Sequence, residues 1–223
     1  MVNVFSGWSD PFNINLDRGS GDWDVRHNLT ASAVYSLPEF KEANGLERGA
    51  LGGWQLSSII QARSGLPTNI QLVSGFFGNP MRPDYTGQPV RAAGANWPNG
   101  NYNPAAFEVP PGWAGVWNDP TTIGTVGRNA LRGPGFFQWD FSLMKNFPIT
   151  ERVRIQFRSD FFNILNHPNF ANPDGGICLA VSGGVCAPNL NFGHSTATVA
   201  TSSGGSISNG TARQEQFSLK IIF

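Results

Sequence analysis

The end of the chain constrains its fold more than any other segment. The last seven residues, Phe217 to Phe223, place apolar side chains at every second position and finish on an aromatic residue. A period of two indicates a β-strand with one apolar face and one wetter face. Chain termini usually fray unless they are tied down, so a strand that continues to the last residue predicts pairing within a sheet. A soluble sheet and a membrane-embedded sheet both remain open from this segment alone.

Four further segments alternate in the same way, and with the C-terminal one they predict five long strands. The expected strands cover about 24–38, 52–63, 136–147, 151–163 and 212–223. The 27 Gly and 16 Pro, together with 17 Phe and 7 Trp, suit strands joined by turn-rich loops. The predicted fold is therefore all-β, an antiparallel sheet of about five to six long strands.

Short connections between these strands alternate with long ones. Little more than Pro148 to Thr150 joins the third and fourth strands, and residues 38–51 join the first two. By contrast, residues 74–135 and 164–211 form the other two connections. Long structureless loops are uncommon in compact soluble domains, whereas transmembrane barrels combine short periplasmic turns with long outer loops. The lengths predict a transmembrane β-barrel segment with long extracellular loops.

The composition of the two strand faces agrees with a membrane wall. The polar faces favour Gln, Asn, Ser and Arg, which suits a hydrated barrel interior where neighbours hydrogen-bond one another. A basic residue that faces lipid costs roughly 2–4 kcal/mol at mid-depth and about 0–1 kcal/mol near the interface. Charged residues on the expected apolar faces lie near strand ends; they are His27, Lys145, Glu151, Arg213 and Glu215.

Five strands are too few to close a bacterial barrel, which has at least about eight. An open edge in lipid costs several kcal/mol for each unsatisfied backbone group. We therefore expect residues 1–223 to be the C-terminal part of a larger, incomplete barrel, with no plug domain. Residues 1–10 lack a basic segment followed by an apolar one, so a secretory signal is expected upstream.

Several stretches resemble one family, in order along nearly the whole chain. They are Asp24–His27, Tyr35–Pro38, Gly52–Ser57, Ser64–Pro67, Gly127–Asn129, Arg132–Gly135, Asp140–Lys145, Phe157–Phe170 and Arg213–Gln216. Together they resemble the C-terminal barrel region of TonB-dependent outer-membrane receptors, of the Oar-like subtype with a carboxypeptidase-regulatory-like domain. The resemblance implies a bacterial outer-membrane location and energised uptake of an unidentified ligand.

The resemblance also implies partners. These are the outer-membrane lipid, the remaining barrel and plug of the full-length receptor, the barrel-assembly machinery, and TonB through an N-terminal part that this sequence lacks. The assembly machinery of such barrels reads the terminal aromatic strand. The expected assembly signal is Phe217, Leu219, Ile221 and Phe223.

Candidate ligand contacts fall in two places. Arg154, Arg158 and Asp160 lie on the polar face of the fourth strand, where they form either part of a ligand path or a structural ion-pair network. Trp97, Trp113 and Trp117 lie in the first long loop, where they either contact a sugar or peptide or pack within the loop. Cys178 and Cys186 are close in a Gly-rich stretch and predict a disulfide in an oxidising exterior.

Other chemistry has little support in the sequence. The 15 basic and 15 acidic residues cancel, so no nucleic-acid partner is expected. The three His accompany no recognisable nucleophile motif, and no metal-ligand spacing is present, so we expect neither an enzyme nor a cofactor. The alternative function is a non-transporting all-β protein for cell-surface adhesion or carbohydrate binding.

Overall fold

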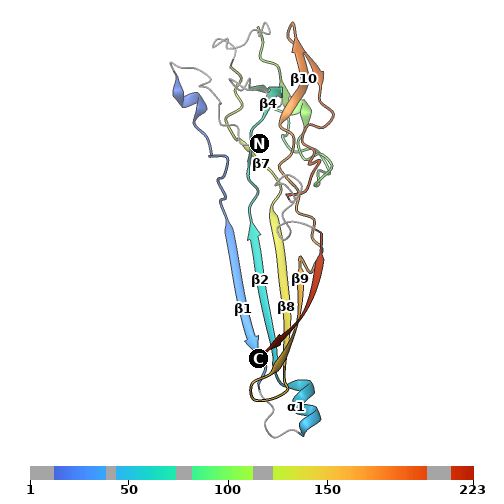
Figure 1. The fold of residues 1–223 in the computed structure, drawn as a ribbon. Helices are drawn as coiled ribbons and strands as arrows, with labels where there is room; N and C mark the ends of the chain where they lie inside the picture. Colours follow the sequence, from blue (N-terminus) through green and yellow to red (C-terminus); the bar gives the residue numbers. More distant parts are fainter. Residues whose placement is uncertain (1–12, 39–43, 74–81, 113–122, 200–211) are drawn as a thin grey trace. The chain divides into compact units, whose positions relative to one another are not determined.

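The computed structural model describes residues 13–38, 44–73, 82–112, 123–199 and 212–223. The chain divides into two compact units. Unit 1 comprises Met1–Val25, Gly65–Gly135 and Phe170–Ala197, and unit 2 comprises Arg26–Ser64, Phe136–Asn169 and Thr198–Phe223. The long strands all belong to unit 2 (Figure 1).

Unit 2 is built on one antiparallel sheet of five strands (Figure 1). They are β1 (Asn28–Ser36), β2 (Trp54–Arg63), β8 (Phe136–Pro148), β9 (Arg154–Phe162) and β12 (Gln214–Ile222). Their order in the sheet is β1-β2-β8-β9-β12, which is also their order along the chain. Within the described residues the sheet stays open, with β1 and β12 at its edges. The all-β, antiparallel and unclosed architecture predicted from alternation is confirmed.

The strands are staggered relative to one another. The pairing of β2 with β8 begins at Arg63 and Phe136, whereas the pairing of β8 with β9 begins further along β8, at Phe141 and Phe161. At the other end, β8 and β9 continue to Pro148 and Arg154, beyond the last β1–β2 pair. A barrel wall requires such a stagger because its strands tilt relative to the barrel axis.

The two short connections lie at the same end of the sheet (Figure 1). In the β8–β9 hairpin, the amides of Ile149 and Thr150 donate to the Val153 carbonyl at 2.9 and 3.0 Å. The β1–β2 connection contains α1 (Gly45–Leu51), which begins after Asn44, whose Oδ1 accepts from the Glu47 amide at 2.9 Å. The chain also finishes β12 toward this end (Figure 1). In the described part of the chain, no helix is both long enough and apolar enough to cross a membrane.

Unit 1 has a hydrophobic core of its own, which the sequence-based interpretation of its segments as loops did not anticipate. The core is formed by Ile70, Leu72, Tyr102, Ala106, Phe107, Val126, Ile177, Cys178 and Phe192. Ile70 and Leu72 do not extend the expected second strand, which ends at β2. They instead lie in and beside β4 (Gln71–Val73), which pairs in parallel with β10 (Gly176–Ser182). This pairing joins the segment between β2 and β8 to the segment between β9 and β12.

Short elements frame this core. β10 also pairs with β11 (Val185–Pro188), β3 (Pro67–Thr68) with β7 (Leu131–Arg132), and β5 (Asp84–Tyr85) with β6 (Phe107–Glu108). Two short 3₁₀ helices, η1 (Ile14–Asp17) and η2 (Pro104–Ala106), complete the unit. The Tyr102 hydroxyl donates to the Arg132 carbonyl at 2.8 Å, and burial raises the pKa of Tyr102, which keeps that donor protonated.

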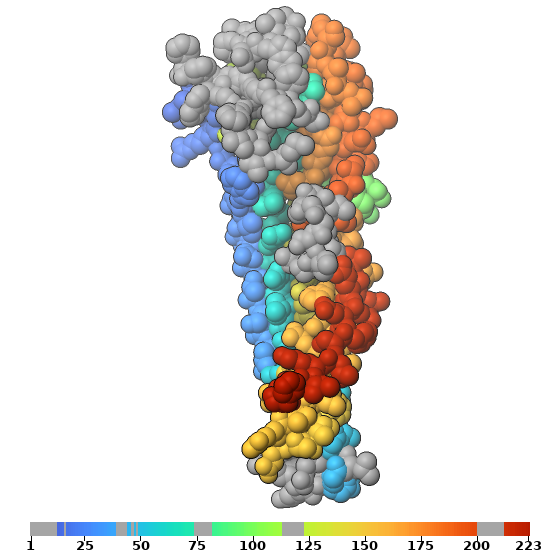
Figure 2. All heavy atoms as spheres, viewed as in Figure 1, coloured from blue at the N-terminus to red at the C-terminus, as the bar shows by residue number. Residues whose placement is uncertain are grey.

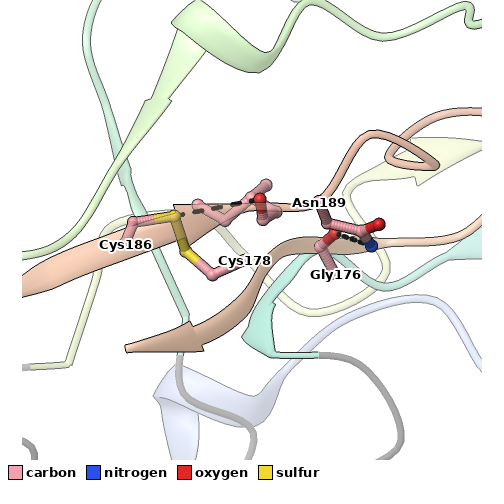
Figure 3. Close-up of a disulfide and its surroundings, with 5 residues drawn as sticks. Gly176, Cys178, Cys186 and Asn189 are labelled. Atoms are coloured by element: carbon pink, nitrogen blue, oxygen red, sulfur yellow. Dashed lines mark hydrogen bonds between the residues drawn. A yellow bond between two sulfur atoms is a disulfide. The ribbon is translucent and has the colours of Figure 1, made fainter. Parts of the chain in front are cut away.

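A disulfide joins Cys178 on β10 to Cys186 on β11 (Figure 3). Beside it, the Asn189 side-chain amide donates to the Gly176 carbonyl at 2.8 Å and to Asp174 Oδ2 at 2.9 Å. The hairpin is therefore fixed covalently at one point and by an amide at another. Disulfides persist in oxidising compartments, which fits a segment outside the cell.

Candidate functional site

Most apolar positions of the five strands share one face of the sheet; the exceptions on the other face are Val34, Ile59, Phe136, Met144, Phe162 and Ile222. Paired residues lie on the same face and successive residues alternate between faces, so the register assigns every side chain. The apolar residues of this face are Leu29, Ala31, Ala33, Tyr35, Trp54, Leu56, Ile60, Ala62, Phe137, Trp139, Phe141, Leu143, Phe147, Ile155, Phe157, Phe161, Phe217, Leu219 and Ile221. We call this set the apolar face.

The apolar face is a single exposed layer within unit 2. Leu29 is 60% exposed, Phe217 63% and Leu219 70%. Every residue of β1 is exposed, on both faces, and Figure 2 shows this strand in blue at one side of the sheet. A soluble domain buries such a face against a second layer, and exposed apolar patches of this extent mark interaction with a partner or a membrane. Hydrocarbon is the environment in which all five strands present apolar side chains at no cost.

Polar groups on the apolar face are few and mostly partnered. The Ser58 hydroxyl accepts from Trp139 Nε1 at 2.8 Å. Glu215 lies 3.8 Å from Arg213 at the start of β12. Ser159 is the exception, because its buried hydroxyl has no hydrogen-bond partner among the described residues. The remaining polar residue, Lys145, is explained by its contacts with α1.

Lys145 caps the C-terminus of α1. Its Nζ donates to the carbonyl oxygens of Ala50 at 2.9 Å and Gly52 at 2.5 Å, and Trp54 Nε1 also donates to Ala50, at 2.8 Å. The last carbonyls of a helix lack intrahelical partners and carry partial negative charge. The ammonium also lies 4.7 Å from the Trp54 ring centroid. A charge on the apolar face is thus satisfied at the end where the short turns lie.

The opposite face, which we call the polar face, carries hydrogen-bonded side chains. Asp160 Oδ1 accepts from Arg158 Nε at 2.8 Å and from the Ser142 hydroxyl at 2.5 Å. Asp140 accepts from Gln138 Nε2 at 2.8 Å and from the Asn163 amide at 2.9 Å. Neighbouring strands therefore satisfy one another on this face, as expected for a narrow hydrated interior.

One side of the sheet faces lipid and the other a polar interior, and a family comparison agrees. A model described as "Outer membrane beta barrel domain" matches residues 2–216. The chain belongs to this family. This outer membrane beta barrel protein is located in the bacterial outer membrane. No curated protein and no solved structure matches its sequence.

The structure places the predicted ligand residues of the fourth strand together. Arg154, Arg158 and Asp160 all lie on the polar face of β9. Arg158 and Asp160 form an ion pair at 2.8 Å, whereas Arg154 is exposed and forms no ion pair with a carboxylate of the described residues. The Arg158–Asp160 pair favours the structural interpretation of this row, whereas the role of Arg154 in a ligand path stays a prediction.

The tryptophans do not form a described cluster. Trp97 is half-buried, packs against the core of unit 1 and meets Tyr102 edge-on, with ring centroids 5.9 Å apart. These contacts favour packing within the loop over ligand contact for this residue. Trp113 and Trp117 lie outside the described residues.

The proposed assembly signal lies on an exposed edge strand. Phe217, Leu219 and Ile221 are on the apolar face of β12, and the Phe223 side chain is 97% exposed. Phe217 stacks on Phe157 of β9, with ring centroids 6.4 Å apart. The terminal strand is therefore paired on one side and open on the other among the described residues.

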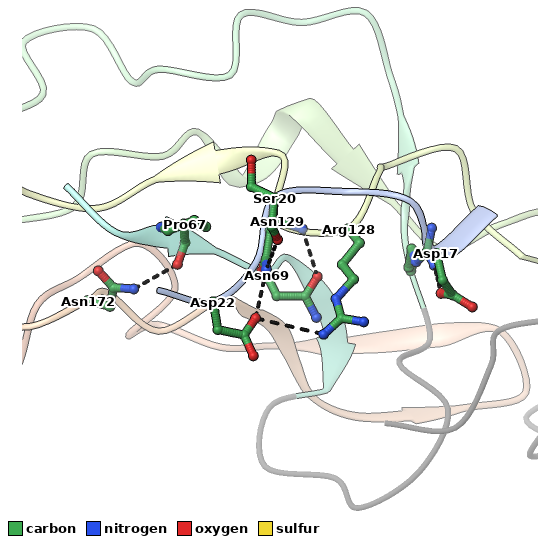
Figure 4. A network of polar contacts seen from close by, with 9 residues as sticks. Asp17, Ser20, Asp22, Pro67, Asn69, Arg128, Asn129 and Asn172 are labelled. Carbon is green, nitrogen blue, oxygen red and sulfur yellow. Dashed lines mark hydrogen bonds and ion pairs between the residues drawn. The ribbon is translucent and has the colours of Figure 1, made fainter. Parts of the chain in front are cut away.

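A polar network in unit 1 was missed by the sequence-based interpretation. Three aspartates that precede β1 pair with three arginines of the first long connection: Asp17 with Arg82, Asp22 with Arg128 and Asp24 with Arg132. Figure 4 shows part of this network, including Asn129 Nδ2, which donates to the Ser20 carbonyl and to Asp22, each at 2.7 Å. The clue in the sequence was a group of aspartates shortly before the first strand, with two of the three arginines, Arg128 and Arg132, next to glycines.

The network also joins three motifs of the family resemblance, Asp24–His27, Ser64–Pro67 and Arg132–Gly135. Arg132 Nη1 donates to the carbonyls of Asp24 at 2.8 Å and Gly65 at 3.1 Å. A Cβ added to Gly65 would lie 1.9 Å from the Gly133 carbonyl oxygen, so only glycine allows the two backbones to approach this closely. Among the described residues, no group of three His, Cys, Asp or Glu could hold a metal ion.

Proposed function

We propose that this protein is the C-terminal part of the barrel of a TonB-dependent outer-membrane transporter. It would contribute barrel wall and extracellular loops to the uptake of a ligand, without catalysis. Its partners would be outer-membrane lipid, the remaining barrel and plug, the barrel-assembly machinery, and TonB through an N-terminal part of the receptor.

The open two-faced sheet is the observation that carries this proposal. Five strands with one apolar face need further strands to satisfy the edges of β1 and β12 in lipid. Large barrels of this kind leave room for a polypeptide plug. The polar side chains that line β8 and β9 suit contact with water or with a plug.

The motifs of the family resemblance supply the TonB-specific part of the proposal. Asp24, Gly65 and Arg132 each come from a different motif, and they meet in one network of unit 1. Residues that are placed for mutual contact are a better basis for a resemblance than isolated matches. The adhesion alternative gains no support from Trp97, because that ring packs against the core.

The natural outer-membrane product that contains this sequence tests the proposal. Its mass and peptide map, measured from isolated outer membranes, should include a plug upstream of residue 1. The purified product should bind the periplasmic domain of TonB, measured by calorimetry. If the natural product lacks a plug and does not bind the TonB domain, the transporter proposal is excluded and the adhesion alternative is favoured.

The assembly partner has a separate test. Deletion of Phe223 from the natural product should lower its amount in the outer membrane several-fold, because the terminal aromatic is the expected recognition element. Substitution of Phe147, an aromatic residue on the same face of β8, by Leu should leave the amount near that of the parent. Equal surface levels with and without Phe223 would remove this residue from the assembly signal.

A further inference from the structure

The polar face changes in charge along β9 and β12. Toward the outer side, Asp160 neutralises Arg158. Toward the end with the short turns, the charged residues of this face are Arg154 and Lys220, and both side chains are exposed. Among the described residues, neither forms an ion pair with a carboxylate. The charged side chains of β9 and β12 in this part of the polar face are therefore both basic.

The register brings these cations together. Lys220 pairs with Gln156, and Arg154 and Arg158 are the residues two positions before and after Gln156 on the same face. Diagonal neighbours of this kind have Cα atoms about 7–8 Å apart, within reach of long side chains. Arg154 and Lys220 have no carboxylate partner among the described residues, so they repel each other, and an anion between them would offset that repulsion.

Neighbouring amides also present donors. Gln156 Nε2 donates to Asn146 Oδ1 at 3.0 Å, which uses the acceptor of Asn146 and leaves its NH₂ group to donate. Asn146, Gln156 and Lys220 are consecutive across β8, β9 and β12. The surface is thus rich in donors on three adjacent strands, a pattern that matches a group with several oxygen acceptors.

We propose that Arg154 and Lys220, flanked by Arg158 and Asn146, form a binding site for an oxyanion, a carboxylate or a phosphate, on the inner wall of the barrel. The inference depends on the polar face lining the barrel interior and does not depend on coupling to TonB. The same chemistry is available from a solute in the lumen and from carboxylates of a polypeptide segment that fills it.

The test uses the natural full-length product in nanodiscs, with citrate and inorganic phosphate as probes at low ionic strength. One of the two probes should bind the parent. The double variant R154Q/K220Q should bind that probe about tenfold more weakly, because two charge-assisted contacts are lost. The matched control R63Q removes a positive charge from the same face at its other end and should bind like the parent. The charge-conserving variant R154K/K220R should retain most of the affinity, and it reports on the site even if the neutral variant assembles poorly.

A second arm identifies the source of the anion. Carbodiimide treatment of the parent, followed by mass spectrometry, links Lys220 to any polypeptide carboxylate in contact with it. Such a link without citrate or phosphate binding assigns the site to a segment within the lumen. Equal binding by R154Q/K220Q and the parent, or neither binding nor a link, would overturn the proposal. TonB binding, measured on the same samples, fails or succeeds independently of these outcomes.

Discussion

The two units use the same apolar residue types in opposite ways. In unit 1, Leu72 is 1% exposed and packs in a closed core. In unit 2, Leu219 is 70% exposed on an edge strand. Water drives the first arrangement because burial removes apolar area from it, whereas lipid makes the second arrangement stable without burial in protein. The difference shows that each unit folds for a different solvent.

The largest test of this contrast compares two isoleucines. Ile70→Ala should destabilise unit 1 by about 2–5 kcal/mol, because Ile70 is fully buried and a cavity remains. Ile221→Ala, on the apolar face and 61% exposed, should cost far less, since lipid fills the vacated space. Proteolysis of intact cells measures the opening of unit 1. Equal protease sensitivity of the two variants would contradict the contrast between the units.

The second test concerns the two faces within unit 2. Phe157→Arg should destabilise the barrel by roughly 2–4 kcal/mol, because Phe157 is on the lipid side near the middle of β9. Gln156→Arg, one residue away on the polar face, should cost under about 1 kcal/mol. Urea unfolding in lipid vesicles gives the free-energy change for each variant. The folded fraction is measured from the heat-dependent gel shift of folded barrels. Similar tolerance of the two arginines would show that the facing is wrong.

The third test asks how unit 2 satisfies backbone groups where the ladder ends. The Asn169 side chain accepts from the Phe137 amide at 2.8 Å and donates to its carbonyl at 2.9 Å, so it replaces a neighbouring strand. Asn169→Leu should cost about 1–3 kcal/mol for each group left unpaired. Asn169→Asp keeps the acceptor and should lose less. Unfolding midpoints in vesicles that rank the two variants in the reverse order would count against this role.

The smallest expected effect separates buried from exposed charges in unit 1. Arg128 and Asp22 are 3.8 Å apart, with side chains 33% and 41% exposed, so Arg128→Gln should cost at most about 1 kcal/mol. Arg82, which is buried beside Asp17, should be much less tolerant of the same change, because its partner would remain as an uncompensated buried charge. Protease sensitivity of unit 1 in intact cells ranks the stability of the Arg128→Gln and Arg82→Gln variants. A greater loss of stability for Arg128→Gln would contradict the assignment of Arg82 as the more important charge.

The sequence by itself determined the five strands of unit 2 and the facing of their side chains. That was possible because a period of two is a local pattern, and a strand in a one-layer wall keeps it over its whole length. The position of Lys145 near a strand end could also be predicted, although its role as the cap of α1 could not.

The tertiary structure alone decided unit 1. Its core joins Ile70, Phe107 and Ile177 from connections far apart in the chain, and its sheets contain short strands without a clear period. The parallel pairing of β4 with β10 and the matching of each aspartate to its arginine are likewise long-range. Such contacts depend on which segments come together in space, and no local spacing of residues encodes that choice.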